Sequence, residues 1–290
     1  FPSRRLSLLA GTTAALGMAG AVAGQSILGW LDHVVTWRQT AWCFAAVAVI
    51  IALVIVAVVP KRPQWFMKQR AESLCAQGIE ADSMWHGLRC VLSSRSMWLL
   101  ALVAGLLYLP LGTFGALWGD RYLSECLKLS DSMAATADAM LFLGVGVAAP
   151  LMGLFADRTG KMRETLILGS VLALVSMIGL LALSPAWSGL APVMLATLGF
   201  GIAGITVAFP MAIHASPHHA RGVAICFVNF FQMLMVGISQ WGTGVLLDAG
   251  ASAPGVYEAW DFRMAFSPLV GGLVLTVILA GFLPRPKPSA

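Results

Sequence analysis

Amide side chains recur at helical spacing within one long apolar segment of this chain. Asn229, Gln232 and Gln240 fall on one helical face together with Val236, because the four residues are three, four and four positions apart. Amides donate and accept hydrogen bonds without acting as acids or bases near neutral pH. The spacing therefore predicts either a surface that binds a polar solute or a set of hydrogen bonds between helices.

Tyr108 stands near the middle of another apolar segment, where polar groups tend to face a cavity or a neighbouring helix. Gly105, Pro110 and Gly112 surround it, and we expect them to loosen or kink a helix there. Tyr108 is thus the best single candidate for contact with a solute. No Asp, Glu, Lys or Arg lies in the middle of an apolar segment, and Asp138 lies near one end, so the sequence does not place a coupling ion.

Residue patterns for catalysis, phosphate binding or metal binding are missing from the sequence. The five cysteines are scattered without a CxxC pair, and nothing resembles a catalytic triad, a phosphate-binding loop or a metal-ligand set. We therefore expect no enzyme activity, no bound metal and no cofactor.

The elements that must position these polar groups are eight long apolar segments. The 290 residues are 59% hydrophobic and 11% charged, with a mean hydropathy of +0.84, whereas about a quarter of the residues of a soluble domain are charged. A helix needs about 20 apolar residues to cross a bilayer, and lipid leaves no partner for exposed backbone amides. We predict membrane-spanning helices at residues 6–31, 40–59, 97–118, 133–156, 166–183, 189–213, 222–247 and 264–283.

Basic residues gather in alternate loops between these segments. Fourteen Lys and Arg residues fall in one set of loops and four in the other, namely Arg38, Arg121, Lys128 and Arg263. The positive-inside rule then places both ends of the chain and the loop 60–95 in the cytoplasm. This pattern explains the net charge of +5 without a nucleic-acid partner. We expect a multi-pass protein embedded in the lipid bilayer of the cell inner (plasma) membrane.

The first two apolar segments resemble the last two, which indicates an internal repeat. Arg5 to Asp32 and Arg221 to Asp248 match in length, and an aromatic-Arg pair opens the next segment in both copies. Transporters are often built from such repeats. Four segments precede the second copy, so a complete first copy would need about 100 to 130 further residues before Phe1. We interpret the chain as a fragment with eight of twelve helices, which we expect not to transport in this form.

The most specific motif is Gly-Leu-Phe-Ala-Asp-Arg-Thr-Gly-Lys-Met-Arg at residues 153–163. It resembles the loop signature of the major facilitator superfamily, Gly-x-Leu-Ala-Asp-Arg-x-Gly-Arg-Lys. Its glycines suit close helix packing and a tight turn, and its aspartate can pair with a cation or a helix N-terminus. The basic residues can pair with acids or lipid phosphates. The resemblance implies a conformational latch, the latch motif, made of Gly153, Asp157, Arg158, Gly160, Lys161 and Arg163.

The resemblance also implies an all-α membrane protein, a polytopic helix bundle of the major facilitator type with two six-helix halves. Residues 1–60 would hold the last two helices of the first half and residues 61–95 the cytoplasmic linker. Residues 96–284 would form the second half, and 285–290 a cytoplasmic tail. In the family, helices at the position of segment 222–247 line a central cavity, and Gln25 lies on the matching helix of the first half. The implied solute site contains Tyr108, Asn229, Gln232, Gln240 and Gln25.

The function implied by the resemblance is transport of a small polar or anionic solute by alternating access, with a proton or cation as a candidate coupling ion. We expect a monomer at full length. Gly20 and Gly24 fit the antiporter signature of the family's fifth helix, but Gln25 replaces its proline and Leu28-Gly29 its glycine pair. That departure favours uptake or symport. The alternatives are proton-coupled efflux of drugs or metabolites, and a non-transporting sensor or scaffold of the same fold.

Overall fold

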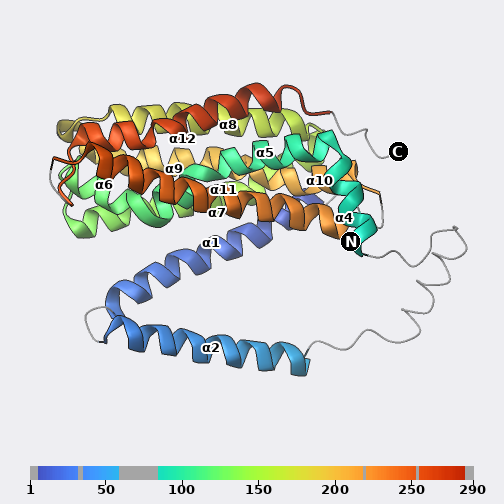
Figure 1. Cartoon of the computed structure of the whole chain (residues 1–290), viewed down its shortest axis with the longest axis horizontal. Coiled ribbons are helices and arrows are strands. Elements are labelled where there is room, and N and C mark those ends of the chain that lie inside the picture. The colour runs from blue at the N-terminus through green and yellow to red at the C-terminus, as the bar shows by residue number, and fades with distance from the viewer. Residues whose placement is uncertain (1–5, 32–34, 59–83, 218–219, 253–254, 285–290) are drawn as a thin grey trace, which may run out of the picture. The chain divides into compact units, whose positions relative to one another are not determined.

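The computed structural model describes residues 6–31, 35–58, 84–217, 220–252 and 255–284, and all regular elements within them are helices (Figure 1). Within these ranges, seven helical spans are long and apolar enough to cross a membrane, and the described apolar part of the first helix, Leu8–Gly24, is shorter. The seven are Arg38–Val58, Arg95–Glu125, Asp131–Thr159, Met162–Ala182, Pro185–Ala215, Arg221–Gly250 and Ala259–Ala280. An all-α, multi-pass membrane fold is thus confirmed.

The chain divides into two compact units, and each is described by itself. The smaller unit comprises residues 21–86. It contains the second part of α1 (Leu6–Leu31), all of α2 (Trp37–Val58) and the first residues of α4 (Met84–Ser93). The apolar side chains of α2 are exposed along nearly its whole length, as expected for a helix surrounded by lipid or by other apolar helices.

The larger unit comprises residues 1–20 and 87–290, and its six spans fall, in chain order, into two triplets of helices. In the first triplet the spans are α5–η2–α6 (Arg95–Leu109, Pro110–Trp118 and Gly119–Glu125), α7 (Asp131–Thr159) and α8 (Met162–Ala182). In the second they are η3–α9–η4–α10 (Pro185–Leu190, Ala191–Ile202, Ala203–Val207 and Ala208–Ala215), α11 (Arg221–Gly250) and α12 (Ala259–Ala280).

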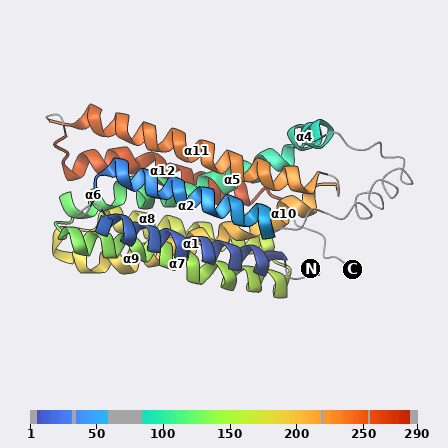
Figure 2. The same ribbon diagram turned by 90° about the horizontal axis from the view of Figure 1, so that it is seen from below.

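The leading span of each triplet packs against the other two spans of the opposite triplet. α5 packs against α11 and α12, whereas α9 packs against α7 and α8. Figure 2 shows α11 and α12 on one side of the bundle and α7 and α9 on the other. α8 and α12 also pack against each other. Since the first span of each triplet is buried by helices of the other, the six spans share one apolar core.

Both leading spans leave α-helical geometry near their middle. In the first span the π-helix η2 begins at Pro110, which has no backbone N–H to continue the α-helical pattern. In the second span the interruption is the 3₁₀ helix η4. The irregular geometry that the sequence suggests around Tyr108 therefore lies immediately after it.

An aromatic cluster closes the core at the end of the bundle where α7 begins. The rings of Phe114, Tyr122, Phe262 and Phe266 are all buried, and their centroids are 5.3–5.9 Å apart in the contacting pairs. The Tyr122 hydroxyl donates a 3.2 Å hydrogen bond to the carbonyl oxygen of Leu180. Each aromatic pair contributes about 0.5–1.5 kcal/mol beyond the area that it buries. The cluster thereby fixes η2 and α6 against α8 and α12.

Candidate functional site

The three amides of α11 lie in three different surroundings. Gln232 is 2% exposed, and its Nε2 has no hydrogen-bond partner among the described residues. Gln240 is half-buried and bonded, whereas Asn229 is exposed. The spacing places the three amides on one helical face, and the structure gives each of them a different exposure. The reason is that the buried side of α11 is centred on Val228, Gln232 and Val236, so Asn229 falls at its edge.

Two hydrogen bonds tie the irregular segment η2 to α11. Gln240 Nε2 donates to the carbonyl oxygen of Gly112 at 2.8 Å, and Thr113 Oγ1 donates to Ser239 Oγ at 2.9 Å. Gln240 therefore satisfies a backbone carbonyl of the π-helix, which is the helix-bonding interpretation of the amide pattern. The Thr113–Ser239 pair had no sequence signal, because Ser and Thr in membrane helices usually bond to their own backbone.

Tyr108 lies on α5 in the turn before Pro110 and is half-buried. Its helix packs against α11, the helix that carries Gln232. Gln25 belongs to α1, and the structure describes its backbone but not its side chain. The structure thus brings together the helices of Tyr108 and Gln232, while the place of Gln25 in a solute site stays a prediction.

Asp157, in the last turns of α7, reaches the beginning of α1. Its Oδ2 accepts a 2.9 Å hydrogen bond from the backbone N–H of Leu8. Leu8 is in the first turn of α1, where backbone N–H groups have no partner within the helix. A carboxylate there satisfies a donor and also interacts favourably with the helix dipole.

The other members of the latch motif shape the short loop between α7 and α8. Gly160 caps α7 in a left-handed conformation, with φ of 69° and ψ of 6°, which is nearly free of strain only for glycine. The Arg163 guanidinium donates a hydrogen bond to the carbonyl oxygen of Gly281, just beyond the end of α12. Gly153 is buried, and Arg158 and Lys161 are exposed. The latch motif therefore contacts α1 through Asp157 and the end of α12 through Arg163.

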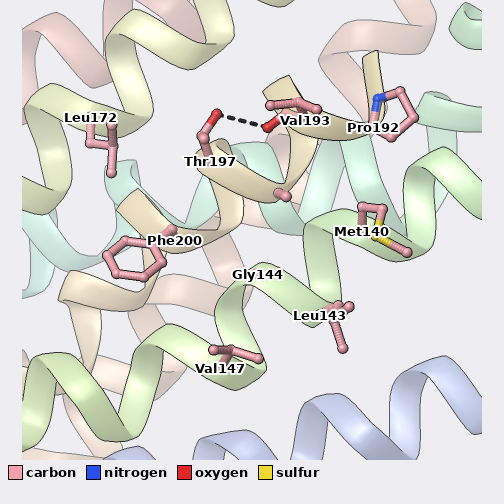
Figure 3. A pocket seen from close by; sticks show the side chains of 10 residues that line it. Met140, Leu143, Gly144, Val147, Leu172, Pro192, Val193, Thr197 and Phe200 are labelled. Carbon is pink, nitrogen blue, oxygen red and sulfur yellow. Dashed lines mark hydrogen bonds between the residues drawn. The ribbon is translucent and has the colours of Figure 1, made fainter. Parts of the chain in front are cut away.

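Two apolar grooves occupy corresponding positions, each between the leading span of one triplet and the other two spans of the opposite triplet. The larger, about 570 Å³, is shown in Figure 3 and is lined by Met140, Leu143, Gly144, Val147, Leu172, Pro192, Val193, Ala196, Thr197 and Phe200. Its lining hydroxyl, that of Thr197, bonds to the Val193 carbonyl oxygen of its own helix. The smaller, about 310 Å³, is lined by Leu109, Met235, Ile238, Ser239, Gly242, Thr243, Leu246 and Pro268. Neither lining includes a residue of the predicted solute site, and both are suited to lipid tails.

Asp138, which lies near one end of its apolar segment in the sequence, is a buried acid. It is 2% exposed, and its Oδ1 has no partner among the described residues. A signal was present in the sequence, because its helical neighbours Ala134, Ala137 and Leu141 form an apolar stripe that continues through its position.

The described part of the chain offers hydrogen-bonding groups within its spans and no group of three or more His, Cys, Asp or Glu placed to hold a metal ion. Such an arrangement can recognise a polar solute. The sequence model of the Major Facilitator Superfamily matches residues 1–240. No curated protein matches the chain significantly.

Proposed function

Because the chain belongs to the major facilitator superfamily, we propose that it moves a small polar or anionic solute across the cell inner membrane by alternating access. Membership of this family supports a multi-pass membrane transporter. The class of solute, the uptake or symport direction and the monomeric state are our proposal. The cytoplasmic placement of both chain ends rests on the 14 to 4 division of basic residues between the loops.

The observation that carries the solute class is the buried amide of Gln232. An unmade hydrogen bond in a buried site costs about 1–3 kcal/mol, and a membrane offers no water along the lipid side to relieve it. A solute with an acceptor oxygen would relieve it. Tyr108 adds a hydroxyl on the packed neighbouring helix. The unpartnered atom of Gln232 is an N–H donor, which supports a polar or anionic solute over a cation.

Proton-coupled efflux of drugs or metabolites is the second candidate, and the two apolar grooves favour it. Apolar cargo needs apolar surface, which the grooves supply. We rank it second because surfaces of this kind also serve as ordinary contact with lipid tails. A non-transporting sensor or scaffold with the same fold is the third.

Solute uptake by the full-length protein in proteoliposomes tests these candidates. A panel of labelled sugars, amino acids, carboxylates and organic cations should give saturable, protein-dependent uptake of a polar or anionic member. Gln232→Leu should weaken its uptake about tenfold, equivalent to about 1.4 kcal/mol. Ser267→Ala is a matched control, since Ser267 is exposed on α12 and bonds only to its own helix. Binding without flux would favour the scaffold, and transport restricted to lipophilic cations would favour efflux.

A further inference from the structure

Asp138 has the properties of a site that binds and releases a proton. We propose that its carboxyl group holds a proton while η2 and α6 pack against α7, and releases it when that packing opens. The proposal rests on the transport function given above and names its coupling ion. It assigns the coupling site to the described part of the chain.

The position of Asp138 is inside the span. It lies seven residues after Asp131, the first residue of α7, which corresponds to a depth of about 10 Å along the helix. Its neighbours on the helix face, Ala134, Ala137 and Leu141, are almost completely buried, as is Asp138 itself at 2% exposure. The carboxyl therefore faces protein packing and not the surrounding lipid or water.

The backbone of α6 closes the space beside the carboxyl. A Cβ atom built on Gly119 would lie 2.6 Å from Asp138 Oδ1, so no larger residue fits there without a shift. The same Oδ1 has no hydrogen-bond partner among the described residues, and neither has the buried Nε1 of Trp118, one residue before Gly119. Two polar atoms at one end of the bundle are therefore left without partners in this packing.

Among the described elements packed against α7, no cation is placed to neutralise a charged Asp138. Four of these elements carry no ionisable side chain, namely η2, η4, α9 and the first fifteen residues of α1. In α8 the ionisable residues are Arg163 and Glu164, which lie at the opposite end of the bundle. α6 carries Asp120, Arg121, Tyr122 and Glu125. Arg121 is paired with Glu125 at 2.7 Å, and the Tyr122 hydroxyl is bonded to Leu180. The remaining group, Asp120, repels a negative charge on Asp138.

Charge and packing at Asp138 are therefore linked. A buried carboxylate without a cation is costly by several kcal/mol, whereas the protonated carboxyl is neutral and retains one donor. If η2 and α6 move away from α7, water reaches the group, its O–H bond breaks, and the proton passes to that water. Conversely, closing this packing requires a proton to be taken up. The proton thus favours one conformation over the other.

The adjoining segment, η2, departs from α-helical geometry. η2 is a π-helix, and two side-chain hydrogen bonds, Gln240–Gly112 and Thr113–Ser239, hold it to α11. α6 has seven residues and follows η2 directly. Irregular turns of this kind often mark places where a helix changes shape. The charge pattern of the loops predicts that this end of the bundle faces the outside, so the proton would be exchanged with the external solution.

Carbodiimide labelling tests whether a proton is bound. Dicyclohexylcarbodiimide is apolar and adds to protonated carboxyl groups within membranes, giving a stable adduct that mass spectrometry locates. The purified full chain in nanodiscs should give an adduct at Asp138 at neutral pH. Asp138→Asn should abolish it, and Asp131→Asn, at the exposed start of α7, should leave it unchanged. Absence of an adduct at Asp138 from mildly acidic to neutral pH would overturn the proposal.

Hydrogen exchange tests whether the proton is linked to movement. After correction for the intrinsic effect of pH, amide exchange in η2 and α6 should rise by up to about tenfold per pH unit, because one proton is linked to opening. Asp138→Asn should remove this pH dependence and keep exchange at its slow, low-pH level. Asp138→Ser, also neutral, serves if the Asn variant does not fold. A pH dependence that survives in a folded neutral variant would refute the linkage. Neither measurement uses a solute, so both stand even if the proposed solute class is wrong.

Discussion

The carboxylate of Asp157 accepts a 2.9 Å hydrogen bond from the backbone N–H of Leu8, a residue 149 positions earlier in the chain. One side chain in the last turns of α7 therefore caps the first turn of α1. By the boundaries predicted from the sequence, α1 belongs to one half of the transporter and α7 to the other. A contact of this kind would hold the halves in one orientation and must break when they move apart.

Removing the charge of Asp157 should alter cycling more than binding. Asp157→Asn keeps an acceptor but loses the interaction with the helix dipole, about 0.3–1 kcal/mol, so we expect transport to slow about two- to fivefold. Asp157→Ala also loses the cap, about 0.5–2 kcal/mol, and should slow it further. Initial rates and equilibrium binding of the solute, measured on the same preparations, separate the effects. Weakened binding with a normal rate would contradict the latch.

Gln232 and Gln240 should respond in opposite ways to replacement by leucine. Gln240→Leu leaves the Gly112 carbonyl without its donor and should lower the free energy of unfolding by about 1 kcal/mol. Gln232→Leu removes an amide that has no partner for its Nε2 among the described residues and should leave stability unchanged or slightly higher. Thermal unfolding of the two variants in the same detergent compares them. Equal destabilisation would show that Gln232 has a structural bond.

Gly160→Ala should destabilise the loop between α7 and α8. Gly160 has a φ of 69°, and the left-handed conformation costs about 1–2 kcal/mol for a residue with a Cβ. Gly222→Ala is the matched control, because Gly222 lies in the first turn of α11 with open space around it, where alanine should stabilise by up to about 1 kcal/mol. The two variants should shift the unfolding temperature in opposite directions, and a shared direction would argue against the strain.

Cys126 should resist alkylation well above neutral pH. Burial, assisted by the negative charge of Glu125, raises the pKa of its thiol from 9.0 to about 12. Cys226 is exposed and should react first. As pH rises above 9.0, the unfolded chain loses the thiol proton before the folded one does. The contribution of Cys126 to folding stability is therefore intact below that value and is lost as pH approaches about 12. Maleimide labelling followed by mass spectrometry gives both rates, and comparable rates would contradict burial.

The spans and the turn chemistry could be predicted from the sequence because both depend on local composition. The described spans from α5 onward agree with the predicted segments to within a few residues, except that the first continues beyond Trp118 through α6 to Glu125. Gly160 has the positive φ that its place in a tight turn predicts. The boundaries of the halves and the linker stay predictions, since residues 59–83 lie outside the described part of the chain.

The surroundings of polar side chains were harder to predict, because they depend on which neighbour covers each face of a helix. The spacing of Asn229, Gln232 and Gln240 correctly gives their angular positions on α11. It does not reveal where the packed side of that helix ends, and for this reason the different exposures of the three amides could not be predicted. The burial of Asp138 could not be predicted from its distance to the centre of the apolar segment. α6 packs against the end of α7 and buries the Asp138 side chain there.

The packing of each leading span against the opposite triplet has a consequence for the insertion of the chain into the membrane during synthesis. α5 emerges from the ribosome before the rest of the six-helix bundle, but two of the helices that bury it, α11 and α12, are synthesised last. Tyr108 of α5 and the carbonyl of Gly112 in the adjoining η2 therefore remain without these final neighbours, in the bilayer or in the insertion machinery, until then. Completion of α12 is therefore the step that allows the first inserted span of this bundle to acquire its final neighbours.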